Sequence, residues 1–93
     1  MWIWKPHPGK FKEMRETVIE IRDHGRRVGG ANEMNCAALS GSFQGHFAIS
    51  MRCDGIQTAK AEAGFRDDEE MMNAISKAFE IGDVIHDLKG RRL

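Results

Sequence analysis

The sequence predicts a small α+β domain in which two helices cover one face of an antiparallel sheet. Three observations support this prediction: two segments have apolar residues at helical spacing, four shorter segments resemble strands, and the segments follow each other as strand, helix, strand, strand, helix, strand. At 93 residues the chain can form one hydrophobic core, so we expect a single domain over residues 1–93.

The first strand and the first helix are expected to meet at a proline-rich corner. Trp2-Ile3-Trp4-Lys5 is aromatic and β-branched, and Pro6 cannot donate a hydrogen bond to a neighbouring strand. The corner Pro8-Gly9-Lys10 then leads into a segment whose outward positions are charged and whose apolar residues share one helical face, namely Phe11, Met14, Val18, Ile21 and Val28. Gly29-Gly30 is typical of a helix C-terminus, so the helix should end there.

The middle of the chain predicts a β-hairpin. Residues 34–40 and 46–53 have strand length and flank a glycine-containing turn at 41–45. If the hairpin turns about Phe43, residues whose numbers sum to about 86 lie opposite each other. This register places four pairs on one face: Ser40 and His46, Ala38 and Ala48, Cys36 and Ser50, Met34 and Arg52. It places the bulkier set on the helix-covered face, with Leu39, Ala37 and Asn35 against Phe47, Ile49 and Met51.

The last third of the chain predicts a second helical region and a final strand. Residues 56–65 indicate a short helix, and Asp67 with Glu70 three residues later predicts the N-terminus of another. The buried face of that helix is expected to hold Met71, Met72, Ile75, Ala78 and Phe79. Residues 83–88 form a possible final strand, which completes the ferredoxin-like arrangement and leaves one sheet face for water, a ligand or a second sheet.

Composition argues against several classes of function. Lysine plus arginine and aspartate plus glutamate each total 14, so the formal net charge is zero and we expect no nucleic-acid partner. No apolar run approaches the roughly 20 residues that cross a bilayer, and no signal-peptide pattern is found, so we expect no membrane association and a cytoplasmic location. Cys36 and Cys53 are expected to be unpaired thiols, and the four histidines lack ligand spacing, so no metal site is expected.

The element order, the segment KPHPGKF at the helix entrance, RRVGG at its exit and the hairpin AALSGSFQGHFAISMRC together resemble the dimeric α+β barrel superfamily. The similarity is greatest to small members near the antibiotic-biosynthesis-monooxygenase and NIPSNAP-like groups. The resemblance implies a homodimer in which two sheets pack face to face, with a pocket between sheet and helices or inside the barrel.

Known activities in that superfamily include cofactor-independent oxygenases that act on phenolic polyketides, haem-degrading enzymes, lactone isomerases and stress-related proteins. The haem-degrading members pair a helix histidine with a tryptophan and an asparagine on strands. Residues 56–81 contain no histidine, which argues against haem, and no other cofactor is expected.

His46, Ser50 and Arg52 are the best polar candidates for a site, because alternate residues of a strand share one face. As catalytic residues, His46 would take a proton from a phenol or enol and Arg52 would hold the resulting oxyanion. The alternative is a strand-end histidine in water and an arginine paired with an acid across the dimer.

Three further residues could line a ligand site. Trp2 and Trp4 could form an aromatic wall for a planar ligand, or could be buried in the helix core or the dimer. Cys36 could line the same cavity, but no nearby base is expected to activate its thiol.

The sequence therefore predicts a protein that binds a small aromatic or enolisable molecule, with cofactor-independent monooxygenase or isomerase chemistry. The alternative is a non-catalytic binding, assembly or stress-related protein whose barrel is filled by its own side chains. Tight packing of Trp2, Trp4 and Met34 would favour the alternative, whereas an open pocket reached by His46 and Arg52 would favour the enzyme.

Overall fold

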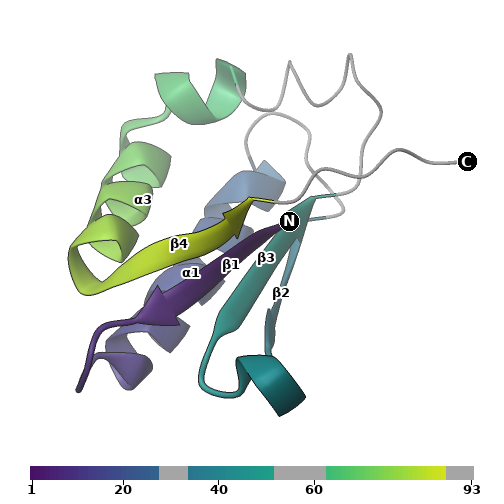
Figure 1. The fold of residues 1–93 in the computed structure, drawn as a ribbon. Helices are drawn as coiled ribbons and strands as arrows, with labels where there is room; N and C mark the ends of the chain where they lie inside the picture. Colours follow the sequence, from purple (N-terminus) through teal and green to yellow (C-terminus); the bar gives the residue numbers. More distant parts are fainter. Residues whose placement is uncertain (28–33, 52–62, 88–93) are drawn as a thin grey trace, which may run out of the picture.

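The computed structural model describes residues 1–27, 34–51 and 63–87, which form an α+β fold (Figure 1). Its order confirms the predicted succession of strands and helices. A helical segment at residues 63–67 precedes the second long helix, and the rest of the short helix expected over 56–65 lies outside the described residues. In chain order the elements are β1 (Trp2–Pro6), α1 (Phe11–Arg27), β2 (Met34–Ala38), the 3₁₀ turn η1 (Gly41–Phe43), β3 (Phe47–Met51), α3 (Glu69–Ile81) and β4 (Gly82–Asp87).

The four strands form one antiparallel sheet in the order β2-β3-β1-β4, which is the ferredoxin-like order. The first strand of the chain is therefore central and β4 lies at one edge beside it. In Figure 1, α1 passes behind the sheet, and α1 and α3 pack against the same core. We call the sheet face that bears these helices the helix-covered face and the other the open face.

Alternation along β1 determines the core. Trp4 has no exposed surface and lies opposite Phe47 of β3, and both contribute to the cluster formed with α1 and α3. The buried residues of α3 are Met71, Ala74, Ala78 and Ile81. Two residues expected on this buried face are partly or largely exposed instead, namely Met72 at 37% and Phe79 at 58%.

The N-terminus of α3 lies one residue later than predicted. Asp68, not Asp67, is the N-cap: its backbone is extended and its Oδ1 accepts a hydrogen bond from the backbone N–H of Met71 at 2.8 Å. At the corner before α1, the backbone N–H of His7 donates to the carbonyl of Ile81 at 2.8 Å, which joins this corner to the end of α3.

The hairpin register differs by one residue from the predicted one. Met34 lies opposite Met51, Cys36 opposite Ile49 and Ala38 opposite Phe47. The faces predicted for β3 are correct, since Phe47 and Ile49 are in the core, but those predicted for β2 are reversed. Met34 and Cys36 now face the helices, and the predicted pairs of Cys36 with Ser50 and of Ala38 with Ala48 are wrong.

The turn explains the shift. The backbone N–H of Leu39 donates to the carbonyl of His46 at 2.9 Å, so these two residues close the hairpin. Between them, η1 begins at Gly41 with φ of 67° and is followed by Gly45 with φ of 85°, conformations that favour glycine. The turn is therefore centred between Ser42 and Phe43 rather than on Phe43.

Candidate functional site

Trp2 and Trp4 share the helix-covered face, but only one of them borders a pocket. The Trp4 ring is enclosed by the core and meets Phe79 edge-on, with ring centroids 4.9 Å apart. Trp2 is half-buried at the edge of the same cluster, and its ring centroid lies 6.4 Å from that of Trp4. The predicted aromatic wall is thus divided between a core residue and a pocket residue.

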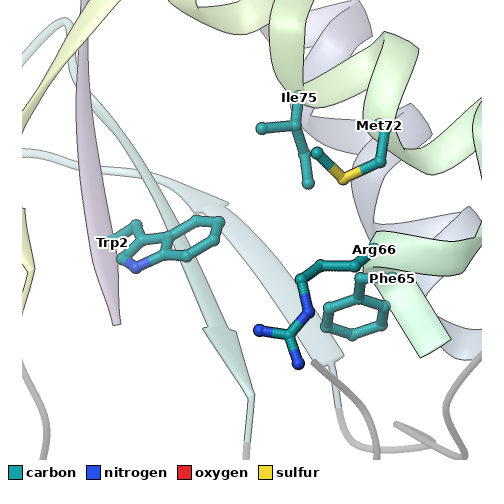
Figure 2. Close-up of a pocket in the computed structure, with 5 residues that line it drawn as sticks. All are labelled: Trp2, Phe65, Arg66, Met72 and Ile75. Atoms are coloured by element: carbon teal, nitrogen blue, oxygen red, sulfur yellow. The ribbon is translucent and has the colours of Figure 1, made fainter. Parts of the chain in front are cut away.

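A pocket of about 250 Å³ opens beside Trp2, between β1 and α3; we call it the Trp2 pocket. Figure 2 shows the indole of Trp2 on one side and Ile75 and Met72 of α3 across from it. Phe65 and Arg66 reach the pocket from the helical segment 63–67. The lining is apolar except for the Arg66 guanidinium and the edge of the indole, an arrangement suited to a flat ring that bears a negative charge.

A hydrogen bond orients the Trp2 ring. The indole N–H donates to Oδ1 of Asp87 at 3.1 Å, because Trp2 and Asp87 lie opposite each other on β1 and β4. The pairing shifts between Ile3 and Trp4, which inserts Ile85 as an extra residue in β4. This bulge places Asp87 on the helix-covered face with Val84. The indole N–H of Trp4, in contrast, is buried and has no hydrogen-bond partner among the described residues.

His46 lies on the open face, away from the Trp2 pocket. It precedes Phe47, whose side chain is in the core, so alternation directs the imidazole to the other side. Its Nδ1 lies 3.2 Å from the carbonyl of Gln44, and its ring is 5.8 Å from that of Phe43. Phe43 also meets His86 edge-on at 5.4 Å, so one phenyl ring contacts both imidazoles.

The other two members of the predicted polar set are only partly placed. Ser50 is half-buried and lies opposite Asn35 of β2, on the face that also carries His46. Arg52 lies outside the described residues. No group of three or more metal-ligating side chains comes together among residues 1–27, 34–51 and 63–87.

Cys36 lies on the helix-covered face of β2, in a groove of about 230 Å³ between this strand and α1. Arg22 donates to its Sγ from Nη1 at 3.7 Å and to Asp23 Oδ1 from Nε at 3.0 Å. The hydrogen bond to Asp23, and to a smaller extent the nearby thiol, raise the pKa of Arg22 above its ordinary value. A guanidinium does not accept protons, so this contact supplies no general base for the thiol.

Sequence reasoning missed the residues that complete the Trp2 pocket. Phe65 and Arg66 belong to a segment with no motif of its own, and Met72 was assigned to the buried face of its helix. The sequence gives one indication of this pocket: Met72 and Ile75 are three residues apart, so they lie together on α3 beside its buried residues. His86 was likewise missed, because its contact with Phe43 depends on how the hairpin turn folds back.

Comparison with family models, with curated proteins and with solved structures finds no match to this chain. Within the described residues, neither long helix has the length and apolar composition that a membrane span requires. The site must therefore be interpreted from its own geometry.

Proposed function

We propose that this chain is a small-molecule-binding protein and that its ligand occupies the Trp2 pocket. The observation that supports this proposal is the combination of an oriented indole, an apolar wall from α3 and one guanidinium around about 250 Å³ of space. This volume is slightly below the roughly 300 Å³ at which pockets for drug-sized ligands begin, so a ligand with a single ring fits best.

The ligand class follows from Arg66. Among the described residues Arg66 forms no ion pair, although its guanidinium borders the apolar pocket. A planar oxyanion such as an aromatic carboxylate, a phenolate or an enolate would place its ring against Trp2 and its oxygens near Arg66. This class includes the aromatic and enolisable molecules that the sequence predicts.

We propose that this pocket binds its ligand without catalysing a reaction. The described residues that line it include no imidazole, carboxylate or thiol, the groups that most often transfer protons. His46 lies across the sheet and does not reach the pocket. The cofactor-independent monooxygenase or isomerase chemistry implied by the resemblance therefore stays a prediction. Such chemistry would have to take place on the open face, where His46 lies.

We further propose a cytoplasmic homodimer of the dimeric α+β barrel type, joined through the open face. The side of that face formed by β2 and β3 supports this, because Ala37, Ala48 and Ser50 are small and uncharged and suit close approach of a second sheet. The unpaired Cys36 thiol fits a reducing compartment. Sedimentation equilibrium should show a dimer, and a stable monomer at micromolar concentration would contradict this assembly.

Benzoate and its neutral analogue benzamide test the ligand site. In ¹H–¹⁵N spectra the chain should give two indole N–H signals, one from each tryptophan. We expect benzoate to shift the Trp2 signal more than that of the enclosed Trp4, and benzamide to bind more weakly. Arg66→Gln should reduce benzoate binding about tenfold, as for the loss of one charged contact, and leave benzamide binding unchanged.

A matched control is Arg15→Gln, which removes an exposed arginine from α1 without touching the pocket. It should bind benzoate as the unaltered chain does. If millimolar benzoate leaves the Trp2 signal in place, or if both arginine variants respond alike, the proposed ligand site is wrong.

A further inference from the structure

A row of three arginines on α1 runs beside the outer strand β2; we call it the arginine row. Its members, Arg15, Arg22 and Arg26, lie on one side of the helix because they are spaced by seven and four residues. Arg22 contacts the Cys36 thiol, and Arg26 donates from Nε to the backbone carbonyl of Met34 at 2.8 Å. The row therefore follows the strand edge.

The same edge presents backbone groups to the outside. Leu39 donates its N–H to β3, so alternation directs the N–H and C=O groups of Ala37 to β3 and those of Cys36 and Ala38 away from the sheet. The contact of Arg26 with the Met34 carbonyl agrees with this alternation and occupies that outward acceptor, so an added strand would pair at Cys36 and Ala38. Among the strands of the described residues, β2 is the last one of the sheet in this direction. An edge of this kind is a template for an added strand.

The groove between α1 and β2 would receive the side chains of such a strand. Its apolar residues include Val18, Ile19 and Phe47, and Arg15 and Arg22 are its charged residues. Arg22 is already paired with Asp23 at 3.0 Å, whereas Arg15 has no ion pair among the described residues, so Arg15 is the first partner for an added carboxylate. In a strand placed beside β2, every second side chain would point to the helix-covered face and meet these arginines.

We propose that the β2 edge binds an extended acidic segment of another protein, which adds a fifth strand and pairs alternate carboxylates with the arginine row. A second copy of this chain is a poorer occupant. If two β2 strands paired with each other, they would bring two arginine rows together, and like charges across an interface are unfavourable. This site is separate from the Trp2 pocket and does not depend on the function proposed for it.

A labelled peptide of alternating glutamate and valine tests the charge requirement. Fluorescence anisotropy should show that it binds the full chain, whereas the same peptide with lysine in place of glutamate should not bind. We expect Arg15→Gln to weaken binding about tenfold and Arg66→Gln to leave it unchanged. Equal binding of both peptides, or no binding of the acidic one at millimolar concentration, would overturn the proposal.

Strand addition itself is tested at Ala38. Ala38→Pro removes an outward N–H without removing a bond to β3, so it should abolish peptide binding, whereas Ala38→Val should retain it. Because the proline variant could fold poorly, amide exchange in the unaltered chain gives a second readout. Bound peptide should slow exchange at Ala38 about tenfold or more. Peptide binding without protection at Ala38 would exclude strand addition. Protection that rises with protein concentration in the absence of peptide would identify a second copy as the occupant and refute the proposal.

Discussion

The side chain of Met34 occupies the space where the Cβ atom of any residue other than glycine would lie at position 25. A Cβ atom built at Gly25 would overlap the sulfur of Met34, and both residues are buried. This contact joins the last turns of α1 to the first residue of β2. It also explains why a glycine is accommodated within a helix, where it normally costs about 1 kcal/mol relative to alanine.

Gly25→Ala should therefore lower the free energy of unfolding by about 1 kcal/mol, because crowding against Met34 outweighs the better helix propensity of alanine. Met34→Ala alone should cost about 3 kcal/mol through the cavity that it leaves. The double variant should be more stable than the sum of the two costs predicts. Urea denaturation of the four proteins measures this coupling, and strict additivity would show that the two residues do not compete for space.

Gly82→Ala should be more costly, by about 3 kcal/mol, because a Cβ there would meet the backbone carbonyl oxygen of Lys5 at 2.7 Å as well as the Met14 side chain. The backbone at Gly82 is extended, so this cost is steric. Gly45→Ala is the matched comparison: it has open space but a φ of 85°, and should cost about 1 kcal/mol. A smaller loss at Gly82 than at Gly45 in thermal or urea denaturation would contradict the close packing of β4 against the corner before α1.

Asp68→Ala should remove about 1 kcal/mol of stability by leaving the Met71 N–H without its cap, whereas Asp67→Ala should have little effect. Urea denaturation of both variants distinguishes the two residues. Equal losses would mean that the helix N-terminus is not held by Asp68 alone.

The two faces of the sheet should be separable in function. His46→Ala alters only the open face, so it should leave the response of the Trp2 indole signal to benzoate unchanged. Oxygen-uptake assays with phenols and quinols test the catalytic prediction. If a rate is found, equal rates in His46→Ala and the unaltered chain would remove His46 from the mechanism. Loss of benzoate binding in this variant would instead contradict the assignment of His46 and Trp2 to opposite faces.

The element order and the faces of β3 could be predicted from the sequence because both follow from local spacing. The apolar alternation of Phe47, Ile49 and Met51 is independent of what lies beside the strand. The register of β2 was not predictable in the same way, since it depends on the conformation of Gly41 and Gly45 in the turn. A shift of one residue was sufficient to move Cys36 to the opposite face.

The candidate site was predicted less completely. Trp2 was identified from its own strand, but its neighbours come from α3 and from the helical segment before it. The pairing of Trp2 with Asp87 also depends on the bulge at Ile85, for which the alternation of β4 gives no signal. A pocket assembled from several elements is a tertiary feature, and helical spacing alone assigned Met72 to the core.

The central position of β1 has a consequence for the order in which the chain can fold during its synthesis. β1 precedes both of its neighbours in the sheet along the chain, by about forty residues for β3 and about eighty for β4. Without these neighbours the two tryptophans have no complete sheet beneath them, and contacts between distant parts of a chain form slowly. Until β3 and β4 have been made, β1 therefore exposes its two tryptophans, and we expect the nascent chain to depend most on molecular chaperones during that interval.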